Sequence, residues 1–596
     1  MISKVFAALS KYGTYPTLRK AVLRIRRSPL LNNYPYWIKS FERCEIEAFI
    51  SNADTDQTET SNVKLVVIMQ VCDRNPDFLS ATIDSLQNQS HKNWELICMI
   101  LEHGNERSRS LLASRESRDA RISVQSEIAP DQVHNATTKL LLNLQQGFVT
   151  FIGQDDLLHP RTLECLATAI CMEPKVKLLY TDEDRIDANG NRFDPYFKPN
   201  WNPELLLSQN YINCLSCWRA EFLLQLADTS DPIEGVQNHS LLMRAAPKIV
   251  DGDVFHIPFP LYHMRASATE ESSAVSNNHL ELAQGNVPAI ADYWSQTTGN
   301  RAQAEVSIDC QNNLYHSNVE LNHWPHVTLV IPHRNSPALL QSVLELWTKT
   351  DYPNLNLVLV DHCSTDTKTR KMLDELAGTD RATICDYDGP FNFSRMCNLG
   401  VKNAEADSHI CFLNNDVQLV DFNWLKILVP YLEIAGVVAV GPLLLYPDYS
   451  IQHAGIALGI GGFAGHYFKH LPYGATSYQR WAYSTRNTSA LTGAALLTKR
   501  SVFDSVGGFD EEVFPTSFSD VDLCLKLSQH GRLVFCPDSK LIHLESQSRP
   551  KTDDLENIQR LREKWGDEIE SDPYFPTIFS RLTEVMTPDY RNSRPL

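Results

Sequence analysis

A short apolar run ends in an acidic tip at residues 408–416, SHICFLNND. The letters ICFL have the character of a buried strand, and Asn414, Asn415 and Asp416 follow them directly. In an open parallel α/β sheet, such a strand presents its terminal polar residues at the carboxyl edge. A carboxylate beside amide oxygens suits a hard divalent cation held against a diphosphate. The alternative is a strand followed by an ordinary Asx turn.

Three further polar groups follow predicted strands in the same part of the chain. They are PHRN at 332–335, VDHCSTD at 360–366, and the acidic pair in FSDVDLCLKL at 518–527, after which comes IHLESQSR at 542–549. The rule for open α/β sheets places such strand ends in one crevice. Together they supply a metal ligand, a base, and basic or hydroxyl groups for phosphate. The alternative for the acid at 520 is helix capping. The candidates are Pro332, Arg334, Asp361, Ser364, Asp520, Asp522, His543 and Arg549.

Predicted strands and helices alternate along two stretches of the chain. This spacing predicts α/β domains with a mostly parallel sheet covered on both faces. The pattern begins near residue 63 and restarts near residue 326, so the chain contains two copies of one architecture. Strands are predicted at 63–69, 94–101, 177–181, 327–331 and 355–360, and the main helices at 76–87, 160–169, 337–347, 367–377 and 392–404.

The length of 596 residues is too great for one hydrophobic core, so several domains are expected. Residues 266–320 are polar and are interpreted as an irregular linker region with one helix near 278–295. We predict a basic helical extension and linker at 1–60, a first α/β domain at 61–300, a linker at 301–325, a second α/β domain at 326–550 and a helical tail at 551–596.

The composition is that of a globular protein, and the formal net charge of −18 argues against nucleic-acid binding. Residues 1–41 contain no Asp or Glu but several Lys and Arg. Such a segment suits either an anionic membrane surface or a solvated helical lead-in. No apolar run reaches the roughly 18 residues of a membrane span. The fourteen cysteines show no framework spacing, and the lone CxxC at 214–217 does not indicate zinc, so a reducing cytoplasm is expected.

The second half of the chain resembles the bacterial glycosyltransferases of family 2, because several separated motifs appear in the family's order. They include PHRN, LVDHCSTD, FNFSRMCNLGV, FLNNDV, YPDYSIQHAGIALG, VGGFDE, FSDVDLCLKL and HLESQSR. These enzymes are inverting, have the Rossmann-like GT-A fold, and use sugar nucleotides to build cell-surface polysaccharides. The resemblance covers 326–550 and implies, with the internal repeat, two tandem GT-A domains.

The resemblance implies which residues contact the donor. Asp361 ends the second strand, where the family reads the nucleotide base, and Pro332 and Arg334 line the same slot. Ser364 lies in the same strand end. The guanidinium groups of Arg395 and Arg549 are suited to holding phosphate oxygens.

The resemblance also implies the residues of the chemical step. Asn414 and Asp416 stand at the family's DxD position, with Asp416 carrying most of the contact to Mn²⁺ or Mg²⁺. His543 stands at the later metal-binding histidine. Asp520 occupies the catalytic-base position, although the preceding acid is replaced by serine, and Asp522 orients the mouth of the helix. Inverting transfer needs a carboxylate to take the acceptor's proton and a divalent ion to absorb charge on the departing diphosphate.

The first copy resembles the family through QDDLLHP, YTDEDRIDANGNRFDPYF and IPFPLYHMR, but its chemical motifs depart from the family's pattern. Where relatives have Asp-His-Asp-Asp, this chain has GQDD at 153–156. Where they have Gly-Ser-Gln-Asp-Tyr-Asp, it has GVQNHS at 235–240. An amide cannot accept the acceptor's proton. We therefore predict a degenerate first domain without transferase activity. Its DEDRID segment is intact, so contact between that segment and a ligand stays an open alternative.

The sequence as a whole predicts an inverting hexosyl- or deoxyhexosyltransferase for O-antigen or capsule synthesis, with its active site in the second domain. The expected partners are a nucleotide-diphosphate sugar donor and a glycan or lipid-linked glycan acceptor, and no nucleic acid. The expected place is the cytoplasm, with peripheral contact at the inner face of the cytoplasmic membrane. Two alternatives stay open: a bifunctional transferase with both domains active, and a non-catalytic glycan-binding scaffold of an assembly complex.

Overall fold

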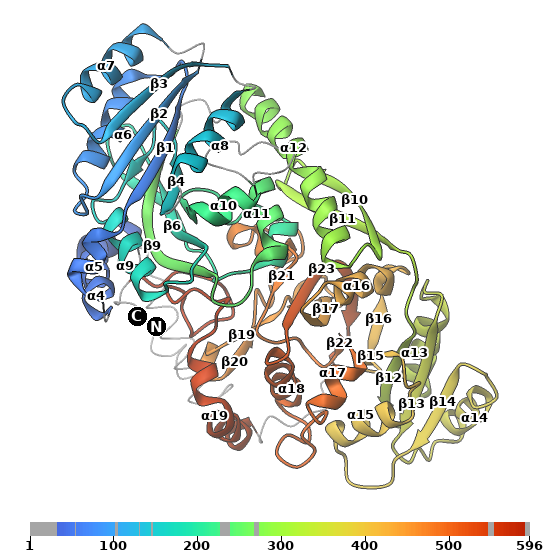
Figure 1. Ribbon diagram of the computed structural model, residues 1–596. Coiled ribbons are helices and arrows are strands. Elements are labelled where there is room, and N and C mark those ends of the chain that lie inside the picture. The colour runs from blue at the N-terminus through green and yellow to red at the C-terminus, as the bar shows by residue number, and fades with distance from the viewer. Residues whose placement is uncertain are drawn as a thin grey trace.

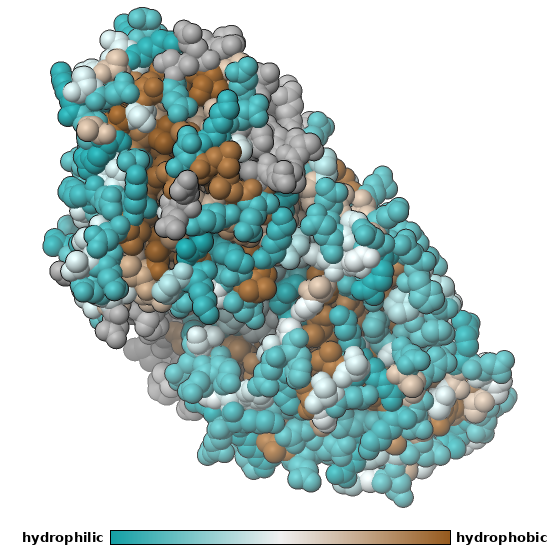
Figure 2. Space-filling model, in the orientation of Figure 1, coloured by the Kyte–Doolittle hydropathy of each residue, from teal (hydrophilic) through white to brown (hydrophobic). Residues whose placement is uncertain are grey.

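The computed structural model describes residues 33–53, 55–101, 105–129, 132–144, 147–226, 239–266, 273–545 and 554–590. They form two α/β domains, each built on one large sheet, with a small hairpin beside them (Figure 1). Most of the basic amino-terminal segment and the predicted phosphate ligand Arg549 lie outside the described residues. Hydrophilic side chains predominate on the face shown in Figure 2, and apolar areas gather mainly over the first domain.

The sheet of the first domain has the strand order β3-β2-β1-β4-β8-β6-β9-β5, and β7 pairs with β6. The four strands β1 to β4 are parallel to one another. Strand β8 runs antiparallel to both β4 and β6. The strands are β1 (Leu65–Val71), β2 (Trp94–Leu101), β3 (Ile122–Ile128), β4 (Phe148–Ile152), β5 (Leu157–Leu158), β6 (Leu178–Ile186), β7 (Arg192–Tyr196), β8 (Ser216–Arg219) and β9 (Val254–Arg265).

The sheet of the second domain has the order β14-β13-β12-β15-β22-β17-β23-β16, with β18 on β17 and β21 on β23. The strands are β12 (Val327–His333), β13 (Leu355–Asp361), β14 (Ala382–Asp386), β15 (His409–Leu413), β16 (Val417–Leu419), β17 (Val437–Leu445), β18 (Ile451–His453), β21 (Arg486–Asn487), β22 (Ala495–Thr498) and β23 (Arg532–His543). A separate two-stranded sheet consists of β19 (Ile456–Leu458) and β20 (Ala464–His466).

Strand for strand, the two large sheets have the same order and the same directions, so the internal repeat predicted from the sequence is confirmed. In both sheets a strand runs antiparallel between parallel neighbours, β8 in the first and β22 in the second. The sequence analysis did not predict this reversal. Each of the two strands has only four residues, too few for a periodic pattern to be seen.

Helices cover the sheets, and side-chain caps determine where several of them begin. The side chain of Asn75 accepts a hydrogen bond from the Asp77 amide in α6, and that of Asn392 accepts one from the Arg395 amide in α15. The helices are α6 (Pro76–Gln87), α7 (Glu106–Glu116), α8 (Val133–Leu144), α9 (Thr162–Met172), α10 (Ala220–Leu226), α11 (His239–Ala245), α13 (Pro337–Lys349), α14 (Thr367–Leu376), α15 (Phe393–Lys402), α16 (Trp424–Glu433), α17 (Arg500–Ser505) and α18 (Ser519–Ser528).

The segment predicted to be an irregular linker is mostly regular. Helix α12 (Ser273–Thr297) is followed by an antiparallel hairpin of β10 (Ala302–Asp309) and β11 (Leu314–Leu321). The interpretation of 266–320 as irregular was therefore wrong for the hairpin. The two strands alternate exposed and less exposed residues, and this polar face hid them in the sequence.

Both ends of the described chain lie against the first domain. In the described part of residues 1–60 the chain forms helices α3 (Tyr34–Trp37) and α4 (Arg43–Asn52), and α5 (Gln57–Asn62) begins within the predicted linker. In the tail, α19 (Asp554–Glu570) is helical, whereas residues 571–590 are not, contrary to the prediction for 551–596. The ring of Tyr590 lies 5.6 Å from that of Tyr34. Within the described ranges, no helix is long and apolar enough to cross a membrane.

Candidate active site

A cleft of about 1790 Å³ opens in the second domain. It is lined by Asn414 after β15, Asp520 at the start of α18 and His543 at the end of β23. Residues of α19 also line it. Three of the predicted site residues, far apart in the sequence, therefore meet at one opening.

Strand pairing brings Asp416 and His543 together. Val417, the first residue of β16, lies opposite His543 in β23, and the Leu544 amide donates to the Asp416 carbonyl at 3.0 Å. As a result Asp416 Oδ1 lies 3.0 Å from His543 Nε2. The side chain of Asn414 is also close, with its Nδ2 3.4 Å from the same ring nitrogen.

Gln452 orients His543, and sequence reasoning missed it. Its Oε1 lies 2.7 Å from His543 Nδ1. An amide oxygen only accepts, so Nδ1 carries the proton, and in the neutral ring Nε2 keeps its lone pair on the side of Asp416. Gln452 lies in β18, within the IQHAG segment, and no local motif marks it as a ligand of the histidine.

The carboxylate–histidine pair fits a divalent cation bound together with a diphosphate. Among the described residues no group of three or more His, Cys, Asp or Glu side chains could hold a metal ion by itself. Mg²⁺-type sites commonly use one or two protein ligands and take the rest from substrate phosphates and water. Asp416 Oδ1 and His543 Nε2 meet this description.

Asp520 lies in the first turn of α18, partly exposed to the cleft. Its two oxygens accept hydrogen bonds from the Gly493 amide at 3.0 Å and from the Val521 amide at 2.9 Å. These bonds fix the carboxylate at the helix start, where it is also a negative charge at the positive end of the helix dipole. The alternative that Asp520 caps the helix was wrong, because α18 begins at Ser519 and its N-cap is Phe518, without a side-chain cap.

Asp522 faces the interior instead. It is fully buried, and it accepts a hydrogen bond from Trp565 Nε1 at 2.9 Å and pairs with Lys564 Nζ at 2.7 Å. Both partners belong to α19, so Asp522 attaches the tail helix to the first turns of α18. This contact agrees with an orienting role for Asp522.

The residues predicted to hold the nucleotide lie at the ends of β12 and β13. Asp361 is fully buried, accepts from the Ser364 amide at 3.0 Å and from the Ser364 hydroxyl, and pairs with Arg370 at 3.2 Å. Ser364 Oγ in turn accepts from the Asn335 amide at 2.7 Å. Pro332 is half-buried and Arg334 is exposed beside this network. We call these strand ends, with Pro332, Arg334, Asp361 and Ser364, the predicted nucleotide slot.

Arg395 is held by a carboxylate in this structure. Its Nε lies 2.8 Å from Glu511 Oε2, and this ion pair, together with its hydrogen bond, raises the pKa of the guanidinium. Its predicted contact with donor phosphate would compete with Glu511.

The first domain retains counterparts of the carboxylate and the histidine. Leu157 lies opposite His263, as Val417 lies opposite His543 in the second domain. The acid just before β5 is Asp156. Comparison of the motifs alone suggested that an acid was lost at Gly153, and it did not identify Asp156 and His263 as the matched pair.

Both acids of the GQDD motif point to neighbouring side chains of the first domain. Asp156 accepts from Tyr262 Oη at 2.6 Å and from the Arg265 amide at 2.9 Å, and burial raises its pKa. Asp155 pairs with Arg74 at 2.9 Å. A Cβ at Gly153 would lie 2.3 Å from Asp156 Oδ2, so this inward turn of the carboxylate requires glycine where the second domain has asparagine.

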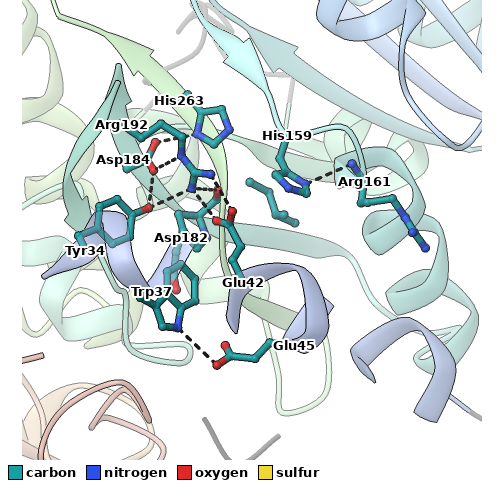
Figure 3. A network of polar contacts seen from close by, with 12 residues as sticks. Tyr34, Trp37, Glu42, Glu45, His159, Arg161, Asp182, Asp184, Arg192 and His263 are labelled. Atoms are coloured by element: carbon teal, nitrogen blue, oxygen red, sulfur yellow. Dashed lines mark hydrogen bonds and ion pairs between the residues drawn. The ribbon is translucent and has the colours of Figure 1, made fainter. Parts of the chain in front are cut away.

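A buried ion cluster holds His263 (Figure 3). Its Nδ1 lies 2.6 Å from Asp184 Oδ1, and Arg192 Nε lies 2.6 Å from the other oxygen of Asp184. Arg192 also pairs with Glu42 at 2.7 Å, and Tyr34 donates to Asp184. Burial, with the Asp184 charge adding to it, raises the pKa of Tyr34 well above its usual value, so the phenol keeps its proton. The amino-terminal helices therefore contact this cluster through Tyr34 and Glu42. Of the GVQNHS motif at 235–240, residues 235–238 lie outside the described residues, and His239 and Ser240 begin α11.

The sheet order, the carboxylate–histidine pair and the acid at a helix start together define a GT-A-type sugar-nucleotide transferase fold. Residues 325–567 match the family described as "Glycosyltransferase like family 2". The family match therefore covers the second domain and the start of the tail.

Two long relatives match most of the chain. It is 32% identical over 529 residues to the O-antigen biosynthesis protein RfbC of Myxococcus xanthus, which covers 87% of this chain and 40% of the relative. It is 32% identical over 501 residues to the protein y4gI of Sinorhizobium fredii, covering 83% and 54%. The chain thus spans about half of these relatives or less. A shorter match, 34% over 119 residues, covers 18% of this chain and 38% of an N-acetylglucosaminyl-diphospho-decaprenol L-rhamnosyltransferase of Mycobacterium tuberculosis.

Solved structures resemble parts of the chain distantly. GalNAc-T7 with UDP, GalNAc and Mn²⁺ has a TM-score of 0.36 and 18% identity, covering 44% of this chain and 52% of that one. The mannosyltransferase PcManGT of Pyrobaculum calidifontis, in complex with GDP-Man and Mn²⁺, has a TM-score of 0.31 and 16% identity, covering 51% and 78%.

Proposed function

We propose that this protein is an inverting glycosyltransferase that moves a sugar from a nucleotide-diphosphate sugar to a glycan acceptor in cell-surface polysaccharide synthesis. The observation that carries the proposal is that His543 and Asp520 line one cleft, with Asp416 at 3.0 Å from His543, inside the domain that matches family 2. The names of the O-antigen relative and the rhamnosyltransferase support the polysaccharide context.

In this proposal each residue of the cleft has a defined task. Asp520 takes the proton of the acceptor hydroxyl as it attacks the anomeric carbon, and its two backbone hydrogen bonds keep the carboxylate in place. Asp416 and His543 hold Mn²⁺ or Mg²⁺, which when bound offsets charge on the departing diphosphate. The slot of Pro332, Arg334, Asp361 and Ser364 receives the nucleotide, with Asn414 at its edge.

The first domain takes no part in transfer in this proposal. Its carboxylates are held by Tyr262 and Arg74, and its histidine is held by Asp184. This arrangement supports a single working site rather than a bifunctional enzyme. The proposed acceptor is a lipid-linked glycan at the inner face of the cytoplasmic membrane, where the basic residues of 1–41 would meet anionic lipid.

The test of the base is Asp520→Asn in the full chain. A donor is first selected by screening nucleotide sugars for a rise in Tm with Mn²⁺, since a bound ligand stabilises the folded state. The amide keeps the size of the side chain but cannot take the proton, so we expect transfer to fall by about 10²–10⁴-fold. Nucleotide binding should stay within about twofold of the wild type, because in this proposal Asp520 acts on the acceptor hydroxyl and not on the nucleotide.

Glu512→Gln is the matched control, since Glu512 is an exposed carboxylate just before α18 and does not line the cleft. It should leave transfer unchanged. Full transfer by D520N would reject Asp520 as the base and would favour a site elsewhere in the chain. Absence of nucleotide binding and of transfer in the wild type would favour a scaffold.

A further inference from the structure

Two histidines contact each other at the wall of the cleft. His453 ends β18 and His466 ends β20, and their Nδ1 atoms lie 3.0 Å apart. The rings are nearly perpendicular, at 84°, with their centroids 5.2 Å apart. His453 is fully buried, whereas His466 is half-buried and lines the cleft together with Asp520.

Backbone contacts decide which nitrogen of each ring carries the proton. The Gly455 amide donates to His453 Nε2 at 3.3 Å, and an amide N–H can only donate. His453 Nε2 is therefore bare, and the neutral ring has its proton on Nδ1. That proton is donated to His466 Nδ1, which must then be bare as well. The remaining proton of His466 lies on Nε2.

The surroundings keep both rings neutral. Burial lowers the pKa of His453 well below its usual value, and the neighbouring His466 and Arg486 lower it further. Burial also lowers the pKa of His466 to about 3, with Lys469 and His543 acting in the same direction. Arg486 is itself buried and donates to the Ala454 and Trp481 carbonyls. A second positive charge beside it would be costly.

Among the described residues, none forms a hydrogen bond with Nε2 of His466. This nitrogen is not one of the fully buried polar atoms, and the His466 side chain lines the cleft. The His466 ring is thus a fixed, uncharged N–H donor at the cleft wall. Its strand β20 belongs to the separate β19–β20 sheet and not to the large sheet. The nucleotide is expected at the carboxyl ends of the large sheet's parallel strands, so this wall faces the other substrate.

We infer that His466 is an acceptor-binding residue, which donates Nε2–H to an oxygen of the acceptor sugar, and that His453 fixes its proton. The inference rests on the proposed function. An uncharged donor suits a hydroxyl or ring oxygen better than a phosphate, for which a cation would be expected. The acceptor hydroxyl must also reach Asp520, which lines the same cleft.

The test separates acceptor binding from donor chemistry in the full chain. Donor hydrolysis uses water as the acceptor, and transfer is measured with a panel of methyl glycosides at saturating donor. In His466→Leu we expect KM for the glycoside to rise about tenfold, the cost of one lost hydrogen bond. Donor hydrolysis should stay within about twofold. His466→Gln, which keeps an N–H at similar reach, should recover most of the loss.

His530→Leu is the control, because His530 is exposed at the end of α18 and does not line the cleft. An unchanged glycoside KM in H466L, with an active wild type, would overturn the inference. A wild type that neither binds nor hydrolyses any donor would instead reject the proposed function.

A second measurement does not depend on activity. Long-range ¹H–¹⁵N spectra of protein labelled at histidine, with signals assigned through H453Q and H466Q, report which ring nitrogen is protonated. We expect the proton on Nδ1 of His453 and on Nε2 of His466. A proton on Nδ1 of His466 would overturn the inference.

Discussion

His543 is held by different partners at its two ring nitrogens. Gln452 accepts the proton of Nδ1, and Asp416 lies 3.0 Å from Nε2. Partners of this kind set the tautomer and the angle of a metal-binding histidine. His263 shows the contrast within one chain, because there Nδ1 meets the charged Asp184 and not an amide.

Gln452→Leu tests this role at the scale of single residues. Leucine fills similar space but offers no acceptor to Nδ1, so the ring is free to change tautomer. We expect the Mn²⁺ concentration needed for nucleotide binding to rise about 10–100-fold. Gln452→Glu should restore much of the wild-type dependence, because a carboxylate also accepts from Nδ1. The control is Gln529→Leu on the exposed end of α18. A wild-type Mn²⁺ dependence in Q452L would show that Gln452 only packs.

At the scale of elements, the equivalent strand pairs of the two domains hold their carboxylate and histidine in different surroundings. In the second domain β16 and β23 hold a carboxylate–histidine pair at an open cleft. In the first domain β5 and β9 hold the equivalent pair, but its histidine belongs to an ion cluster joined by Tyr34 of α3 and Glu42 of the π-helix η1 (Ile38–Glu42) (Figure 3). The positive charge in this cluster is the guanidinium of Arg192, whose side chain is only 12% exposed. An internal cation thus neutralises Asp184 and Glu42 in the closed site.

Arg192→Met tests the closure of the first site. It removes the cation and leaves two carboxylates, with 0% and 6% of their side chains exposed, without their ion-pair partner. Breaking a buried ion pair in this way costs about 3–5 kcal/mol, so chemical denaturation should show a loss of this order. Arg43→Met is the control, because that side chain is 88% exposed and its ion pair with Glu47 lies at the surface, so we expect almost no change in the free energy of unfolding. Equal losses in the two variants would mean that the cluster is not stabilised by Arg192.

At the scale of the whole molecule, the two copies are joined by buried polar contacts. Glu204 of the first domain is fully buried and pairs with Arg532 of β23 at 2.8 Å. The side-chain amide of Asn487, in β21, donates to Glu204 at 2.6 Å. The backbone amide of Asn487 donates to the side chain of Asn202 at 2.8 Å. The first domain therefore contacts strands β21 and β23 of the second domain through buried polar groups. This explains in physical terms why a copy without chemistry can remain part of the fold.

Much of this organisation could be predicted from the sequence. The strand at 94–101 and the helix at 76–87 are observed with the predicted bounds, because long apolar runs and an asparagine cap followed by proline are strong local signals. The placement of Asn414 and Asp520 at one cleft followed from the rule for open sheets. The hairpin at 302–321 was missed because its exposed face is polar. Gln452 and Arg192 were missed because their roles arise from partners at least 90 residues away, His543 and Glu42.

The measurement that tests the account most directly is the number of nucleotides that one chain binds. Isothermal titration of the full chain with UDP, GDP and dTDP in Mn²⁺ should give one site per chain for the preferred nucleotide, because the first site is closed by Arg192 and Tyr34. The double variant Asp416→Ala with His543→Ala should lose that site. Two sites per chain, or one site of unchanged affinity in the double variant, would contradict the claim that a single metal-dependent site lies in the second domain.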